Sequence, residues 1–109
     1  MENLECRTEL QGDTLTAYLH GAIDHHTARQ ARETVDSDIV DFSPKRLVLD
    51  LRDVEFMDSA GLGLILGRYS KMSERGGTVC VREPSDSILR IIKMAGMERY
   101  IEIEVAARK

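Results

Sequence analysis

The sequence predicts an α/β protein built on a mixed, mainly parallel β-sheet, and three observations support this fold class. Two stretches of alternating apolar residues, 4–10 and 15–19, flank the turn dipeptide Gly12-Asp13 and predict an opening hairpin. Three stretches with the 3.6-residue period of amphipathic helices follow the hairpin. These stretches alternate with short β-rich runs, so the chain forms successive βαβ units with right-handed crossovers.

Two helices are predicted between the hairpin and residue 77. The first ends near Ser43-Pro44, and its apolar residues recur at intervals of three and four: Ala28, Ala31, Val35 and Ile39. The second begins at Ser59 and closes at Gly76-Gly77, and its predicted inward face holds Leu62, Ile65, Leu66, Tyr69 and Met72. The helical period places Leu64 on nearly the opposite side, so we expect Leu64 to be exposed.

A third helix and three further strands complete the predicted order. The strands are residues 46–51, 78–82 and 100–105, and the last alternates apolar residues with glutamate, as is typical beside solvent or at an edge. Ser85-Asp86 caps the third helix and Gly96 ends it, with four inward positions: Ile88, Ile91, Ile92 and Ala95.

Ligand and partner sites in such sheets gather in loops at the carboxyl ends of the strands. Two loops of this kind are predicted, residues 21–26 after the second strand and residues 52–59 after the third. If these two strands are neighbours, Asp24 and Ser59 lie on the same rim of the sheet.

Length and composition predict a single domain, residues 1–109. With 42% hydrophobic and 31% charged residues, the chain is typical of soluble globular proteins. Its formal net charge of -4 and scattered basic residues argue against a nucleic-acid partner. A signal-peptide pattern and an apolar stretch of roughly 18 residues are both missing, so we expect a cytoplasmic protein without a membrane partner. Cys6 and Cys80 fall on predicted strands and are interpreted as structural.

Ser59 stands between Asp58 and a Gly-Leu-Gly step in the stretch FMDSAGLGLIL, residues 56–66, and its role has several interpretations. The simplest is a helix N-cap, whose oxygen accepts a hydrogen bond from an early backbone N–H. A nucleophile on a strand-to-helix elbow would require glycine at position 57, which is Met, and a histidine after the serine. All three histidines precede Ser59, so hydrolase chemistry is disfavoured.

Nucleotide and metal sites are also disfavoured. The spacing of Gly61, Gly63 and Gly67 is one residue longer than the dinucleotide fingerprint, and a Lys-Ser/Thr pair does not follow it. Gly63 and Gly67 are better explained as a flat helix flank against which another element packs. His25 and His26 are adjacent, point apart and have no evident third ligand, so neither a metal nor a cofactor is predicted.

The remaining interpretation makes Ser59 the substrate of a modification. A phosphate at a helix N-terminus meets free N–H groups and the positive end of the helix dipole, so the fold tolerates it. A partner docking at this rim must instead desolvate about two added negative charges beside Asp24 and Asp58. Phosphorylation would therefore switch binding off without unfolding the protein.

The stretch LVLDLRDVEFMDSAGLGLILGRYSKM, together with GAIDHHTA upstream and Gly96-Met97, resembles the STAS-domain anti-sigma factor antagonists. The resemblance covers residues 4–105 and looks most like the sporulation-type antagonist. It implies the STAS fold and a partner-switching module without catalytic activity. In this family the unphosphorylated antagonist binds an anti-sigma factor that is also a serine kinase, and so frees a sigma factor. The kinase then phosphorylates the antagonist, and a PP2C-type phosphatase resets it.

The resemblance also implies residue roles. Ser59 is the phosphoacceptor, Asp58 stands beside it, Asp24 matches the family's loop aspartate, and Ala60 replaces a second hydroxyl residue that relatives often carry. We expect the partner-binding surface to comprise Asp24, Met57, Asp58, Ser59, Gly61, Leu62, Gly63 and Leu64. Leu64 and Met57 are expected to supply an exposed apolar contact, so that Leu64→Lys weakens binding without unfolding. The rival hypotheses are a STAS scaffold or transporter-associated domain that is not phosphorylated, and a small nucleotide-binding enzyme.

Overall fold

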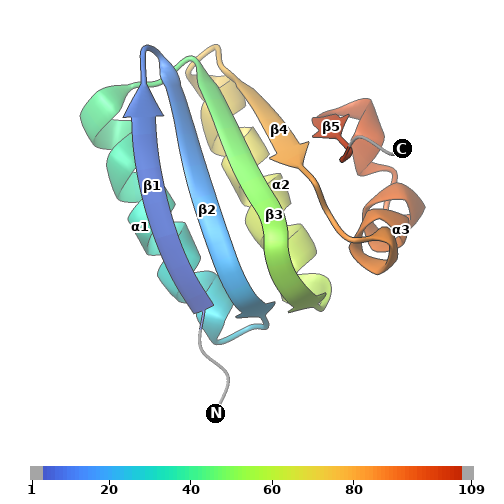
Figure 1. Ribbon diagram of the computed structural model, residues 1–109. Coiled ribbons are helices and arrows are strands. Elements are labelled where there is room, and N and C mark those ends of the chain that lie inside the picture. The colour runs from blue at the N-terminus through green and yellow to red at the C-terminus, as the bar shows by residue number, and fades with distance from the viewer. Residues whose placement is uncertain (1–3, 107–109) are drawn as a thin grey trace.

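A computed structural model describes residues 4–106 and shows a five-stranded sheet whose strand order follows the chain (Figure 1). Its strands are β1 (Leu4–Gln11), β2 (Thr14–Ile23), β3 (Arg46–Met57), β4 (Thr78–Arg82) and β5 (Glu102–Glu104). β1 and β2 pair antiparallel, whereas β2 to β5 pair parallel. The predicted mixed, mainly parallel sheet is therefore confirmed.

The helices lie on one face of the sheet or at its side. They are α1 (Thr27–Phe42), α2 (Ser59–Glu74) and α3 (Asp86–Met94), followed by the 3-10 turn η1 (Met97–Arg99). Because the strand order follows the chain order, crossovers of one hand carry successive helices to the same face. Figure 1 shows α1 and α2 behind the sheet and α3 beside β4 and β5. None of the helices in residues 4–106 combines the length and hydropathy of a bilayer-spanning segment.

The core fills the space between this face of the sheet and the helices. Its fully buried large side chains come from the strands and from all three helices: Leu15, Ile23, Leu47, Leu49, Leu51, Val35, Ile39, Ile65, Met72, Ile88 and Ile92. α1 packs on the sheet with the apolar face that its sequence predicts, since Ala31, Val35 and Ile39 are all buried. The predicted hairpin is also confirmed, with Gly12 at a φ of +64° in the turn that joins Gln11 to Thr14.

β3 continues to Met57, although the sequence predicted a strand that ends at Leu51. The register between β2 and β3 shifts between Tyr18 and His20 and again between Gly21 and Ala22. Such bulges disturb the alternation of buried and exposed residues, which hides the second half of a strand from a period-two pattern. Most of the segment 52–59, which the sequence predicted as a loop, is therefore found to be strand, and only Asp58 separates β3 from α2.

The C-terminal elements differ from prediction at their ends. Ser85 Oγ accepts a hydrogen bond from the Ile88 N–H at 3.3 Å, which confirms the predicted cap of α3. The helix ends at Met94, so Ala95 is exposed rather than inward. η1 then buries Met97, and the final strand begins later than predicted because the N–H groups of Tyr100 and Ile101 donate to the Met97 carbonyl oxygen. β5 lies at the edge of the sheet, as expected.

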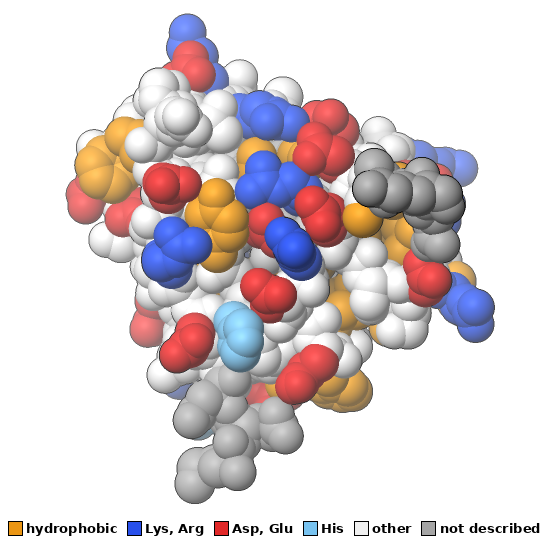
Figure 2. Space-filling view, in the orientation of Figure 1, with side chains coloured by type: hydrophobic (Ala, Val, Ile, Leu, Met, Phe, Trp, Pro, Cys, Tyr) orange, Lys and Arg blue, Asp and Glu red, His pale blue; other side chains and the backbone are white. Residues whose placement is uncertain are grey.

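The opposite face of the sheet is open and carries a mixture of basic and acidic side chains (Figure 2). Arg82 donates from Nε and Nη2 to Asp50 Oδ2 at 3.1 and 3.0 Å. The Arg7 guanidinium lies 4.3 Å from the centre of the Tyr18 ring, a cation–π contact. Long charged side chains of this kind cover apolar surface with their aliphatic stems, so the open face remains polar towards solvent.

Candidate functional site

The predicted loops meet at one rim of the sheet. Ile23 and Met57, the last residues of β2 and β3, are register partners. The Asp58 N–H donates to the Ile23 carbonyl oxygen at 3.2 Å, so the residues that follow the two strands lie beside each other. The expectation that Asp24 and Ser59 share a rim, which depended on β2 and β3 being neighbours, is confirmed.

Asp24 organises the start of α1. Its Oδ1 accepts hydrogen bonds from the backbone N–H groups of His26 and Thr27, both at 2.9 Å. Its carbonyl oxygen accepts from the Ala28 N–H at 2.8 Å, and the Thr27 hydroxyl donates to the Ala22 carbonyl oxygen at 2.8 Å. The Thr27 N–H is the main cause that lowers the pKa of the Asp24 carboxyl, and burial opposes it. Asp24 is therefore a fixed negative charge at the rim.

Asp58, and not Ser59, caps α2. Asp58 Oδ1 accepts a hydrogen bond from the Ala60 N–H at 2.8 Å, and its backbone is extended, as an N-cap requires. Ser59 is the first helical residue and is exposed, and its hydroxyl makes no hydrogen bond to any residue in the range 4–106. The N-cap interpretation of Ser59 is therefore wrong, and its hydroxyl is open to solvent at the helix N-terminus.

Gly61 and Met57 form a close contact beneath the rim. A Cβ added at Gly61 would overlap Met57 Cγ, so only glycine lets the first turn of α2 lie over the end of β3. Met57 is only 3% exposed. The expectation that Met57 supplies an exposed apolar contact is wrong, because this methionine packs under the helix.

Leu64 is also buried, with 5% of its surface exposed, so the predicted exposure of Leu64 is wrong. The buried face of α2 consists of Gly61, Leu64, Ile65, Arg68 and Met72. A projection that counts only apolar residues leaves out Gly61 and Arg68, and it therefore turns the helix away from its real orientation. Leu62 is half-buried against the core, whereas Gly63 is exposed.

The sequence matches the STAS domain family over residues 5–108. The chain belongs to the STAS domain family. The anti-sigma F factor antagonist of Paenibacillus polymyxa is 35% identical to it over 101 residues, which are 93% of this chain and 86% of the relative. The predicted resemblance to anti-sigma factor antagonists is thus confirmed.

Solved structures confirm the STAS fold. The anti-sigma factor antagonist SpoIIAA in its unphosphorylated form superimposes with a TM-score of 0.81 at 24% identity, over 93% of this chain and 89% of SpoIIAA. The phosphorylated form of SpoIIAA, a Bacillus cell fate determinant, superimposes with a TM-score of 0.74 at 24% identity, over 93% of this chain and 92% of that one.

Two exposed apolar side chains near Ser59 in the STAS domain were missed from the sequence. Leu66 is 49% exposed and lies seven residues after Ser59, so two helical turns place both on the same side of α2. Phe56 is 52% exposed near the end of β3. The three-residue spacing of buried residues in the second half of β3 is not visible in the sequence, and the helical period predicted Leu66 on the inward face of α2.

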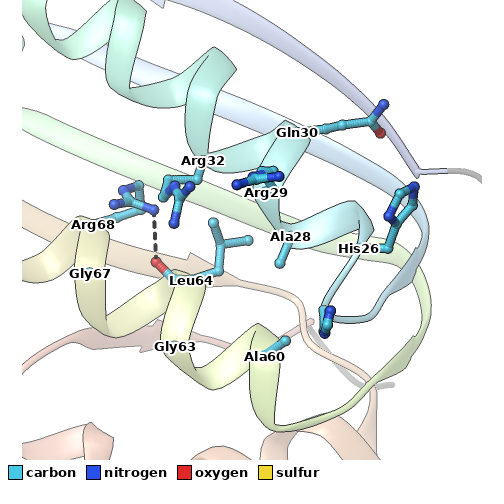
Figure 3. Close-up of a pocket in the computed structure, with 11 residues that line it drawn as sticks. His26, Ala28, Arg29, Gln30, Arg32, Ala60, Gly63, Leu64, Gly67 and Arg68 are labelled. Carbon is cyan, nitrogen blue, oxygen red and sulfur yellow. Dashed lines mark hydrogen bonds between the residues drawn. The ribbon is translucent and has the colours of Figure 1, made fainter.

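A groove of about 750 Å³ runs between α1 and α2 of the STAS domain, beginning at the rim (Figure 3). Its α2 wall includes the small residues Gly63 and Gly67, and a Cβ at either glycine would meet nothing within 4 Å. The prediction that another element packs closely against these two glycines is therefore wrong. They leave space, and Figure 3 shows Arg29 and Arg32 of α1 facing this space across from Arg68 of α2.

The cysteines of the STAS domain lie away from the rim. Burial raises the pKa of each thiol, Cys6 and Cys80, to about 11, so both are protonated at neutral pH. Cys80 Sγ and carboxylate oxygens of Glu102 and Glu104 lie within 4.8 Å of one another, an arrangement able to hold a metal ion that the sequence did not suggest. Glu102 is paired with Arg46 at 3.1 Å, and this ion pair competes with metal binding.

Proposed function

We propose that this STAS domain is an anti-sigma factor antagonist that is controlled by phosphorylation of Ser59. The unphosphorylated chain acts in the cytoplasm as a single domain, residues 1–109, and binds an anti-sigma factor that is also a serine kinase. Binding frees the sigma factor, which this chain affects only indirectly. The chain needs no cofactor and has no catalytic activity of its own. The similarity to an anti-sigma F factor antagonist supports a sporulation-type role.

The observation that carries the proposal is the free hydroxyl of Ser59 at the start of α2. Because Asp58 provides the cap, the Ser59 Oγ can enter a kinase site without the helix losing its cap. In the proposed reaction the kinase transfers the γ-phosphoryl group of ATP to Ser59 Oγ, and ADP and the hydroxyl proton leave. The positive end of the helix dipole favours the phosphate that forms.

The phosphate would act on binding through charge. Asp24 and Asp58 already place two carboxylates at the rim, and phosphoserine adds about two further negative charges. A partner must desolvate these charges when it covers the rim, which weakens the complex. A PP2C-type phosphatase would restore the uncharged hydroxyl. That SpoIIAA has this fold in both its unphosphorylated and phosphorylated forms supports a switch that does not unfold the chain.

Mass spectrometry of the intact protein tests the proposal after incubation with the anti-sigma factor kinase and magnesium ATP. The wild type should gain one phosphate and Ser59→Ala none. Ser70→Ala is the matched control, because Ser70 is an exposed serine on the same helix. Phosphate uptake by Ser59→Ala would assign the modification to another residue. If no variant gains phosphate from a kinase that is active on another substrate, the chain is an unregulated STAS scaffold.

A further inference from the structure

The groove between α1 and α2 concentrates positive charge in a protein whose formal net charge is -4. Arg29, Arg32 and Arg68 line it, and His26 lies at its rim end (Figure 3). His25, which directly follows Asp24 in the chain, also lines it. None of the described residues that line the groove is acidic. Several cations that share one concave surface raise the local potential, so the groove attracts anions.

Arg68 gives the groove a buried cation with unused donors. Its side chain is only 7% exposed, and its Nε lies 2.8 Å from Asp36 Oδ1. These two atoms form an ion pair without the alignment of a hydrogen bond. Nη1 donates to the Leu64 carbonyl oxygen at 3.5 Å, and Nη2 has no hydrogen-bond partner in residues 4–106. A guanidinium has five N–H donors, so Arg68 keeps donors for an anion.

Burial lowers the pKa of the Arg68 guanidinium, the Asp36 carboxylate opposes this shift, and Arg32 adds to it. The negative charge of Asp36 thus offsets the positive charge of Arg68, while Arg29 and Arg32 remain as exposed cations on the facing helix. An added anion between the helices would relieve the repulsion between Arg32 and Arg68. Arginine suits this role because its planar guanidinium binds carboxylates in a bidentate manner.

We propose that the groove binds an acidic segment of the protein partner that docks beside Ser59. The inference rests on the proposed function for the identity of this partner, the anti-sigma factor. The groove extends along α2 from Ala60 to Arg68, about 12 Å at 1.5 Å per residue, which matches about four residues of extended chain. Ser59 precedes Ala60 at the rim end, so a phosphate on Ser59 repels the same acidic segment that the groove attracts.

Titration calorimetry with the anti-sigma factor tests the inference at low and physiological salt. In Arg29→Gln/Arg32→Gln both changes are at exposed positions, so circular dichroism should show an intact fold. Arg52→Gln/Arg90→Gln is the matched control, because it removes the same charge from exposed positions that do not line the groove. We expect the groove variant to bind at least about tenfold more weakly at low salt and the control to bind within about twofold of wild type.

The salt dependence adds a second readout. The groove variant loses charge pairs between the groove and the partner, so its affinity should depend less on salt concentration. The affinity of the control should keep the wild-type salt dependence. Equal affinity of the groove and control variants, with wild type binding, would overturn this inference and leave the proposed function standing. Failure of the wild type and both variants to bind would overturn the proposed function and the inference with it.

Discussion

Gly61 lies so close to Met57 that a Cβ at position 61 would overlap the Met57 side chain. Glycine within a helix is otherwise unfavourable by about 0.5–1 kcal/mol relative to alanine. The contact therefore explains why the first turn of α2, which presents Ser59 and Asp58, contains a glycine. It also fixes the height of that turn above the end of β3.

The first prediction follows from this contact. Gly61→Ala should lower the free energy of unfolding by roughly 1–3 kcal/mol, because the added methyl group overpacks a buried site. Gly63→Ala is the control, since a Cβ there meets nothing within 4 Å. Because alanine favours the helix more than glycine does, Gly63→Ala should stabilise the protein by about 0.5–1 kcal/mol. Urea denaturation measures both, and equal midpoints would contradict the close contact.

The second prediction concerns the two leucines on opposite sides of α2. Leu64→Ala should lower the free energy of unfolding by about 2–5 kcal/mol, because it opens a cavity in the core. Leu66→Ala should change it by no more than about 0.5 kcal/mol, because Leu66 is exposed. Thermal unfolding of the two variants checks the orientation of the helix, and the reverse order would show that α2 is rotated.

The third prediction moves the apolar partner contact from Leu64 to Leu66. Leu66 shares the exposed side of α2 with Ser59, so Leu66→Ser should weaken anti-sigma factor binding by at least about tenfold, the effect of an interface anchor. Val40→Ser is the control, because Val40 is exposed near the far end of α1. Biolayer interferometry measures both affinities. Wild-type affinity of Leu66→Ser would place the apolar contact elsewhere.

The fourth prediction separates charge from stability at Ser59. Ser59→Asp should keep the free energy of unfolding within about 0.5 kcal/mol of wild type, because Ser59 is exposed and a carboxylate suits a helix N-terminus. The same variant should bind the anti-sigma factor more weakly than Ser59→Ala does. Equal binding by two well-folded variants in titration calorimetry would indicate that charge at this position does not control the complex.

The fifth prediction concerns acid and Asp24. The folded state holds the pKa of this carboxyl below its ordinary value of 3.8, mainly through the hydrogen bond from the Thr27 N–H. The ionised carboxylate therefore stabilises the fold fully above pH about 4, and this contribution is lost as the pH falls through the lowered pKa. Asp24→Asn should be less stable than wild type at neutral pH, and the difference in urea midpoint should shrink on acidification. A pH-independent difference would contradict the role of charge.

Turn dipeptides, helical periodicity and capping residues were sufficient to predict the hairpin, the three helices and the parallel strands. They were not sufficient for the ends of β3 and β5, because the bulges of β3 depend on its pairing with β2 and because Tyr100 and Ile101 hydrogen-bond to Met97. The orientation of α2 was also out of reach. Arg68 faces inward beside Asp36, and Asp36 lies on another helix, so the pairing is not a local feature of the sequence.

The candidate site was predicted best where local chemistry decides it. The order of elements predicted loops at the carboxyl ends of parallel strands, and the pairing of β2 with β3 brings Asp24, Asp58 and Ser59 to one rim. The surface around them depends on packing between elements. The sequence therefore predicted Met57 and Leu64 as exposed and Leu66 as buried, and the structure shows the reverse.

The strand order of the sheet has a consequence for how the chain can fold. Every strand after the first pairs with the strand that precedes it in the sequence, so each βαβ unit can dock on an edge that is already formed. Pairings between sequence neighbours close shorter loops and generally allow faster folding than distant ones. The rim that carries Asp24 and Ser59 is built from the ends of β2 and β3 and the starts of α1 and α2, so it does not depend on the pairing of β4 and β5.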